Sequence, residues 1–291
     1  MNKDKIEYLE PSTRRRYQTL WEEFDKFCID TLQATYPYHT QHVELYVVYL
    51  KRYKNISVSH IRLHLSAIAS HCKMHDLLDP TKSFGTGALL KAYQKTEKVK
   101  RVRLPISEEL LNKICHNLGK VVHSKQDKYL FMLIYQFMFW FALRISEVTD
   151  TKHNLRSEHV KLDSAKNTLT IHLQSYKFSK GATAKLEIPC DQGSLLRTNY
   201  QKYMKTRGKK VGPFFIKKGK PLKRSAVAAV LEKILGHIGE DPKQYGTHSL
   251  RIGRGTDLYQ KGTAILNMKK FGRWSSNAYT KYIKPASISC T

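Results

Sequence analysis

Residues 246–285 read GTHSLRIGRGTDLYQKGTAILNMKKFGRWSSNAYTKYIKP and contain most of the residues in this chain that could act on a phosphodiester. His248 and Arg251 are three residues apart, so they share one face of the helix predicted here. Trp274 follows in an FGRW turn, and two tyrosines come after it. An imidazole, a guanidinium, an indole N–H and a phenol can together attack a phosphodiester and stabilise its charged transition state. Because the stretch has no carboxylate cluster for a metal, a phenol is the predicted nucleophile, and the indicated chemistry is breaking and rejoining of DNA.

The net charge of the whole chain indicates the same kind of partner. The 291 residues include 51 Lys+Arg against 24 Asp+Glu, which gives a net charge of +27. Such an excess destabilises a compact chain by self-repulsion unless a polyanion neutralises it, and nucleic acid is the obvious polyanion. Histone-like and ribosomal proteins are as basic but usually shorter and less aromatic. A membrane surface is a weaker alternative because no basic amphipathic tail stands apart from the globular sequence.

The cysteines and the most apolar run are typical of an intracellular globular protein. The cysteines are odd in number and lack CxxC spacing, so we expect reduced thiols. The run YLFMLIYQFMFWFAL, residues 129–143, is too short to span a bilayer comfortably and predicts a buried core helix. The five cysteines are Cys28, Cys72, Cys115, Cys190 and Cys290.

The first part of the chain is predicted to form a helical domain. PSTRRRYQTLWEEFDKFCIDTL opens with Ser12 or Thr13 as an N-cap and then places apolar side chains at helical spacing. KTEKVKRVRLP has many charges, no apolar periodicity and a final proline, which indicates a linker. Three further helices are predicted in residues 39–53, 57–76 and 79–95. The predicted domains are residues 1–95 (helical core-binding domain), 96–105 (linker) and 106–291 (catalytic domain).

The second predicted domain is mixed α/β but mostly helical. KNTLTIHL and TAKLEIPC alternate apolar and polar residues, so they predict two strands of a small antiparallel sheet, joined through QSYKFSKGA. ISEELLNKICHNL and the apolar run predict helices before them. Further helices are predicted near residues 193–206, 223–238, 248–261, 263–271 and 275–284. The predicted fold class is therefore mainly α, with one small sheet in the C-terminal domain.

Five short motifs occur in order along the chain: Arg144 in LRISE, a lysine in the predicted hairpin, HSLR, GRW and KYI. This order resembles the active site of the tyrosine recombinase (phage-integrase-like) superfamily. PSTRRRYQTLWEEFDKFC similarly resembles its helical core-binding domain, so the resemblance covers about residues 11–285. GRWSSNAYTKYI and SVSHIRLHLSAIASH are most similar to recombinases of eukaryotic mobile elements, of the Crypton or tyrosine-recombinase retrotransposon kind.

The resemblance implies a role for each motif residue. Tyr282 would attack the scissile phosphate and form a 3′-phosphotyrosine, which conserves bond energy, so no ATP, metal or other cofactor is implied. Arg144 and Arg251 would hold the non-bridging oxygens, each stabilising the transition state by ~3 kcal/mol. His248 would take up the phenol proton, and Trp274 would donate its indole N–H to a phosphate oxygen.

The lysine and the acidic residue follow from the same resemblance. Lys177 in the hairpin is the implied general acid for the leaving 5′-oxygen. Lys180 is the competing choice because loop length shifts the register. Glu147 fits the acidic position that steadies Arg144, although an arginine at a helix exit is by itself more often an ordinary salt-bridge partner.

The nucleophile is a choice between Tyr279 and Tyr282, which lie one helical turn apart. The family pattern of tyrosine, apolar residue and basic residue matches YIK at Tyr282. The spacing of Tyr282 from Trp274 also fits the fold better. Without Arg144 and the HSLR motif, two packing tyrosines on an amphipathic helix would be an equally good interpretation.

Basic residues outside these motifs are predicted to contact DNA. RRR near the start and HIRLH in the third helix place such groups on the first domain, and the linker adds others. Arg254, one turn after Arg251, is expected on the DNA backbone or on a carboxylate such as Asp257. For any single basic residue of RRR or HIRLH, a position on a solvated surface without DNA contact is nearly as common. The predicted DNA contacts are Arg14, Arg15, Arg16, His60, Arg62, His64, the linker lysines on either side of Val99, Arg101, Arg103, Lys180 and Arg254.

Together these observations predict a site-specific DNA recombinase of a mobile element. The family implies double-stranded DNA sites with a dimer on each and a DNA-dependent homo-tetramer, and no membrane is expected. In a eukaryotic host the predicted location is the nucleus, and otherwise the intracellular DNA. A type IB topoisomerase and a domesticated, inactive DNA-binding protein are the competing interpretations, and the filled catalytic positions favour an active enzyme over the latter.

Overall fold

The computed structural model describes residues 9–97, 103–176, 179, 181–274 and 279–280. The chain divides into two units, Met1–Lys100 and Arg101–Thr291. The fold class is the predicted one: the chain is mainly helical and carries a small antiparallel sheet in the second unit.

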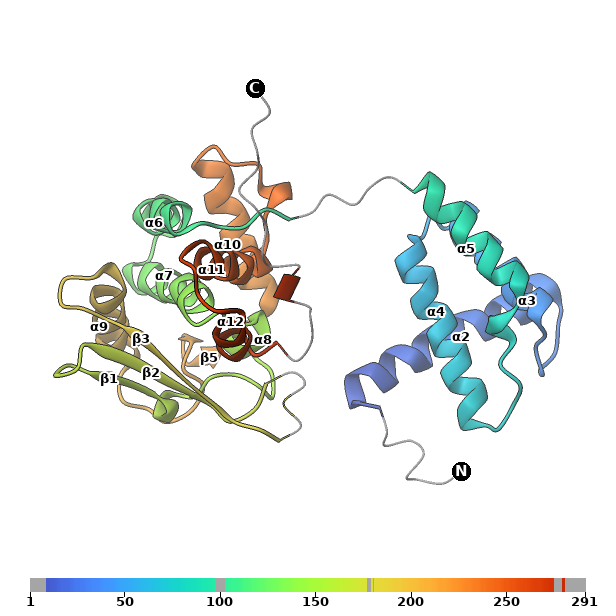
Figure 1. Ribbon diagram of the computed structural model, residues 1–291, viewed down its shortest axis with the longest axis horizontal. Coiled ribbons are helices and arrows are strands. Elements are labelled where there is room, and N and C mark those ends of the chain that lie inside the picture. Colours follow the sequence, from blue (N-terminus) through green and yellow to red (C-terminus); the bar gives the residue numbers. More distant parts are fainter. Residues whose placement is uncertain (1–8, 98–102, 177–178, 180, 275–278, 281–291) are drawn as a thin grey trace. The chain divides into compact units, whose positions relative to one another are not determined.

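The first unit is built from helices whose apolar faces meet in one core. The helices predicted from apolar spacing are present, and Phe24, Tyr46, Ile61 and Ile68 are buried at the centre. Burying each such side chain contributes ~1.5–3 kcal/mol relative to leaving it in water. The elements are α2 (Pro11–Leu32), α3 (Thr40–Arg52), α4 (Val58–Met74), α5 (Phe84–Thr96) and the short 3-10 helix η1 (Pro80–Lys82) (Figure 1).

His64 lies inside this core. It is 2% exposed, and its Nδ1 is 3.1 Å from the Tyr46 hydroxyl. Helical spacing places it one turn from Ile61 and Ile68, so the apolar face of α4 carries its ring inward. The prediction that His64 contacts DNA is therefore wrong, whereas Arg62 in the same HIRLH motif is exposed.

Two histidines make the stability of the first unit depend on pH. Burial, followed by the positive charges of His60 and Arg16, lowers the pKa of His64 from 6.5 to about 4. Burial, followed by the charge of His75, lowers the pKa of His71 from 6.5 to about 4. Between pH 6.5 and 4 the unfolded chain therefore binds protons that the folded unit excludes. The free energy of unfolding consequently falls as the pH falls through that window.

His64 alone is expected to make the first unit about 2 kcal/mol less stable at pH 5 than at pH 7.5. Hydrogen exchange of the α4 amides in the full chain measures this difference. His64→Gln keeps a hydrogen-bonding group for Tyr46 but does not titrate, so it is expected to flatten the pH dependence. An unchanged pH slope in that variant would contradict the assignment.

α7 (Lys125–Trp140) is the central helix of the second unit and corresponds to the predicted apolar core helix. Leu130, Leu133, Ile134 and Phe137 are fully buried along it. α9 (Leu195–Arg207) packs on one side of it and α11 (Thr247–Gln260) on another (Figure 1). None of the helices in the described part of the chain has the length and apolar character needed to cross a membrane. The other helices are α6 (Glu108–Asn117), α8 (Ile145–Val148), α9 (Leu195–Arg207), α10 (Arg224–His237), α11 (Thr247–Gln260), α12 (Ile265–Gly272), η2 (Leu118–Lys120), η3 (Ser157–His159) and η4 (Pro242–Gln244).

The sheet has three antiparallel strands in the order β1-β2-β3. The two predicted strands correspond to β2 (Thr168–Leu173) and β3 (Ala184–Pro189), whose register pairs Ile171 with Leu186. β1 (Val160–Asp163) was not predicted. A second small hairpin, β4 (Ile216–Lys217) and β5 (Lys220–Pro221), was also missed. The predicted helix over residues 275–284 lies outside the described residues except at 279–280.

α11 is held against the start of the second unit by a close backbone contact. The Ile106 N–H donates to the Ser249 carbonyl at 3.0 Å, and the Leu104 N–H donates to the Gln244 carbonyl at 2.8 Å. A Cβ on Gly253 would lie 1.7 Å from the Ile106 carbonyl oxygen. Only a glycine permits this approach, which sets the position of the helix that carries the HSLR motif.

Candidate active site

Arg144 stands where α7 ends and α8 begins. Ala142 takes a left-handed backbone conformation with φ 47°, which turns the chain sharply after the apolar helix. Arg144 is then the N-cap of α8, and its own N–H donates to Glu147 Oε2 at 2.8 Å. Its guanidinium lies 3.3 Å from Glu147 Oε1, and 19% of the side chain remains exposed. The turn therefore places a cation partly at the surface above a fully buried carboxylate.

Arg251 is completely buried on α11. Its guanidinium donates to the carbonyl oxygens of Ala142 and Gly272. The ring of Trp274 lies 5.1 Å from the guanidinium carbon, a cation–π distance. A Cβ on Gly272 would lie 2.5 Å from that ring, so the glycine makes room for Trp274. Arg251 thus connects the turn at Ala142 to the turn at the end of α12.

Arg273, in the FGRW turn, is part of this cluster and was missed by sequence reasoning. Its backbone is left-handed (φ 53°), and its side chain is 2% exposed. Its Nη2 lies 2.9 Å from Glu147 Oε2 and donates to the Ala142 carbonyl at 3.2 Å. Burial lowers the pKa of Arg273, Glu147 raises it, and Arg144 lowers it again. The only sequence signal was its place between the glycine and the tryptophan of the motif.

His248 lies at the N-terminus of α11, next to the arginines. Withdrawal of its ring from bulk water, followed by the positive charges of Arg251, Arg144 and Arg103, lowers its pKa from 6.5 to about 4. The residue nevertheless keeps exposed surface. Its imidazole is therefore neutral at pH 7 and can accept a proton.

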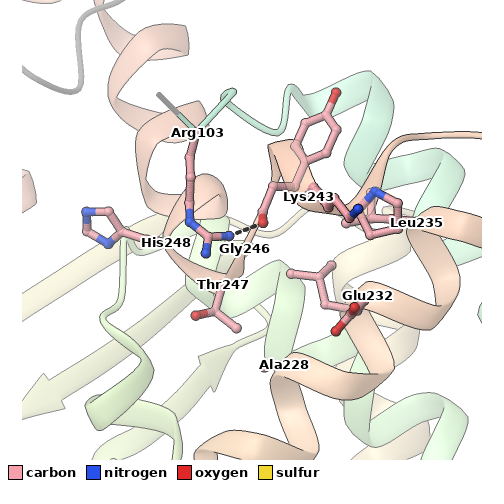
Figure 2. Close-up of a pocket in the computed structure, with 11 residues that line it drawn as sticks. Arg103, Ala228, Glu232, Leu235, Lys243, Gly246, Thr247 and His248 are labelled. Carbon is pink, nitrogen blue, oxygen red and sulfur yellow. Dashed lines mark hydrogen bonds between the residues drawn. The ribbon is translucent and has the colours of Figure 1, made fainter. Parts of the chain in front are cut away.

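Arg103 completes the positive surroundings of His248. Its guanidinium donates to the Tyr245 carbonyl and lies against Gly246, the N-cap of α11. Figure 2 shows Arg103 between His248 on one side and Lys243 on the other, at a cavity of about 460 Å³. A helix N-terminus already carries partial positive charge, so an arginine placed there favours an anion.

The charges of the site do not cancel. Glu147 lies within 4 Å of two guanidinium groups, those of Arg144 and Arg273. Arg251 is close by and is bound to neutral carbonyl oxygens. A surplus of fixed cations beside a neutral imidazole and a helix N-terminus is suited to one phosphodiester.

The predicted site residues fall into two groups. The structure brings together Arg144, Glu147, His248, Arg251 and Trp274. Tyr279 is described, and Lys269 Nζ lies 5.5 Å from the centre of its ring. No cluster of His, Cys, Asp and Glu able to hold a metal occurs within the described ranges. The predicted residues that lie outside the described ones are Lys177, Lys180, Tyr282, Arg101 and the linker lysines on either side of Val99.

The residues predicted to contact DNA differ in their exposure and in their side-chain partners. On the first unit Arg15, Arg16 and Arg62 are exposed, and Arg16 Nη2 is 3.5 Å from His60 Nε2 on the neighbouring helix. Arg14 on α2 is half-buried. On the second unit Arg254 pairs with Asp257 at 2.6 Å, the carboxylate partner that was the alternative to DNA.

The chain resembles a known protein family in sequence and several solved structures in fold. A model of the phage integrase family matches residues 104–286. Sequence comparison with curated proteins finds no match. The fold is similar to that of XerH site-specific recombinase bound to its difH substrate, with a TM-score of 0.65, 14% identity, and 95% of this chain and 76% of that chain covered.

Two other DNA-bound structures share the fold. The Tn1549 transposon integrase in complex with transposon right-end DNA has a TM-score of 0.65 at 13% identity, covering 97% of this chain and 91% of that one. A lambda integrase dimer bound to a COC′ core site has a TM-score of 0.63 at 15% identity, covering 95% and 72%. With the family model matching well over half of its length, the chain belongs to the phage integrase (tyrosine recombinase) family.

Proposed function

We propose that this protein is a site-specific DNA recombinase of a mobile element. It cuts and rejoins DNA through a 3′-phosphotyrosine and uses neither metal nor ATP. The observation that carries the proposal is the meeting of four residues: Arg144 pairs with the buried Glu147, Arg251 lies on the Trp274 ring, and both arginines lower the pKa of His248. These residues come from three separate parts of the second unit.

The cleavage step assigns one task to each group. The phenol oxygen of Tyr282 attacks phosphorus while His248, neutral at pH 7, accepts the phenol proton. Arg144 and Arg251 stabilise the charge on the non-bridging oxygens, and Trp274 donates from its indole N–H. The bond to the 5′-oxygen breaks, and Lys177 or Lys180 protonates the leaving oxygen. Attack by another 5′-hydroxyl reverses these steps and reseals the strand.

The partner is double-stranded DNA at specific sites. The net charge of +27 favours a polyanionic partner, and the exposed arginines of α2 and α4 supply a basic face on the first unit. XerH, the Tn1549 integrase and lambda integrase are each described bound to DNA. We further propose a dimer on each site, a tetramer during strand exchange, a Crypton-like element as the source and the nucleus as the location. GRWSSNAYTKYI is the motif that supports this subgroup.

A suicide substrate tests the proposed chemistry. The DNA is a selected pool of duplexes nicked beside the cut, so that cleavage traps the covalent complex, and EDTA is present throughout. We expect a protein–DNA adduct that survives denaturation. Tight DNA binding without any adduct would instead indicate an inactive DNA-binding protein. Relaxation of supercoiled plasmid by a monomer, without paired sites, would indicate a topoisomerase.

A further inference from the structure

We propose that Arg273 is a positioning residue for DNA cleavage. It neutralises Glu147, so that the positive charge of Arg144 remains available to the scissile phosphate. This inference rests on the proposed cleavage function and gives a role to the arginine of the GRW motif, to which the family resemblance assigned none.

The two ion pairs of Glu147 are unequal. Arg273 Nη2 lies 2.9 Å from Glu147 Oε2, whereas Arg144 Nη1 lies 3.3 Å from Oε1. Charge-assisted hydrogen bonds are typically ~2.7–2.9 Å long, so the pair with Arg273 is the close one. Arg144 is held by its side chain more loosely and keeps 19% exposure, against 2% for Arg273. Of the two guanidinium groups, that of Arg273 is thus the closer partner of the carboxylate, which Arg144 also binds through its backbone N–H.

The net charge of Arg144, Arg273 and Glu147 explains why the loss of Arg273 would slow cleavage. Two guanidinium groups and one carboxylate leave this triad with one net positive charge. Without Arg273 the triad reduces to Arg144 and Glu147, which cancel. The freed carboxylate would then draw Arg144 into a two-point pair and away from the phosphate.

Arg273 also holds the backbone turn at Ala142, which leads to Arg144 and which the Arg251 side chain binds. The Ala142 carbonyl accepts from Arg273 and from Arg251, and the Arg273 carbonyl accepts from Arg144 at 3.5 Å. Ala142 and Arg273 both hold left-handed backbone conformations, which cost non-glycine residues about 1 kcal/mol or more. The turns after α7 and α12 therefore hold each other in place.

Fold stability alone does not account for this arginine. Its Nε and Nη1 are buried and have no hydrogen-bond partner among the residues that the structure describes. A buried ion pair is often no more stabilising than apolar side chains of similar volume. The arrangement maintains a charged site at some expense to stability.

The test compares Arg273→Met and Arg273→Lys with wild type on the suicide substrate. Single-turnover cleavage is expected to slow ~100-fold in Arg273→Met, while the Kd for DNA changes by less than about threefold. Arg273→Lys restores the charge beside Glu147 and is expected to recover to within about tenfold of wild type. If the wild type cleaves the substrate but Arg273→Met and Arg273→Lys cleave at the same rate as each other, the proposal is overturned. Absence of cleavage by wild type would instead refute the proposed function itself.

A second readout separates positioning from mere packing. In the Arg273→Met background, adding Glu147→Gln removes the uncompensated carboxylate, so the double variant is expected to cleave faster than Arg273→Met alone. If Arg273 only stabilised the fold, the double variant would be slower, and this outcome refutes the proposal. Arg207→Met is the matched control, since Arg207 is buried and donates to the carbonyls of Phe214, Lys210 and Pro213. It is expected to lower the melting temperature without changing the cleavage rate of folded protein.

A charge-neutral substrate gives a third readout that does not depend on the amount of folded protein. On a scissile methylphosphonate, which carries no charge, the penalty of Arg273→Met relative to wild type is expected to shrink from ~100-fold to a few-fold. Equal penalties on the charged and the neutral substrate would refute the proposal. Thermal melts of both variants confirm that folded protein is being compared.

Discussion

Tyr282→Phe is expected to abolish the covalent adduct on the suicide substrate, whereas Tyr279→Phe is expected to retain it. The phenol oxygen is the atom that bonds to phosphorus, and phenylalanine has no group to replace it. Tyr282 matches the family pattern in YIK, and Tyr279 has Lys269 Nζ 5.5 Å from its ring centre. The measurement is the shifted protein band on a denaturing gel, with DNA binding measured in parallel.

The two tyrosine variants serve as controls for each other because each removes one hydroxyl and preserves a ring. Loss of the adduct only in Tyr279→Phe would keep the chemistry but transfer the nucleophile to Tyr279. An adduct in both single variants would mean that either phenol can attack. That result would contradict the assignment of Tyr282.

Gly253→Ala is expected to destabilise the second unit by about 4 kcal/mol or more. The new Cβ would lie 1.7 Å from the Ile106 carbonyl oxygen and 2.7 Å from its carbon, and a backbone cannot rotate away as a side chain can. The same segment donates from the Ile106 N–H to Ser249, so relief of the clash costs that hydrogen bond. A unit of this size should then melt roughly 10 °C or more lower, as seen by calorimetry.

Gly236→Ala is the matched control in the same unit. Gly236 is also helical, and its added Cβ would meet only Pro242 at 3.6 Å, an ordinary contact. Alanine is a better helix former than glycine, so this variant is expected to melt at the wild-type temperature or slightly above it. If Gly253→Ala melted within about 2 °C of the control, the close approach of α11 would not be rigid in solution.

The long elements could be predicted because their patterns are strong. The apolar run at residues 129–143 coincides closely with α7, and alternation identified β2 and β3. β1 was missed because VKLD is four residues long and none of them is fully buried. β4 and β5 are two residues each, in a segment rich in lysine and glycine, and no periodicity can develop over that length.

Site residues that belong to a recognisable sequence motif could be predicted. Contacts between residues far apart in the sequence could not. Arg144 and Arg251 could be identified from LRISE and HSLR, and the structure places them together. The pairing of Arg273 with Glu147 joins residues 126 apart, which no local pattern reveals. His64 was wrongly predicted for a different reason. The basic HIRLH motif indicated an exposed surface, but helical spacing places His64 on the buried face of α4.

The interlocked turns after α7 and α12 have a consequence for protein synthesis. The contact of Arg144 with the Arg273 carbonyl spans 129 residues, so at ~5–20 residues per second a ribosome makes the second turn roughly 6–26 s after the first. A nascent chain of intermediate length contains Arg144 and Glu147, whose charges cancel, but still lacks Arg273 and Trp274. Under the proposed function, the arginine site therefore cannot assemble until both turns have been synthesised.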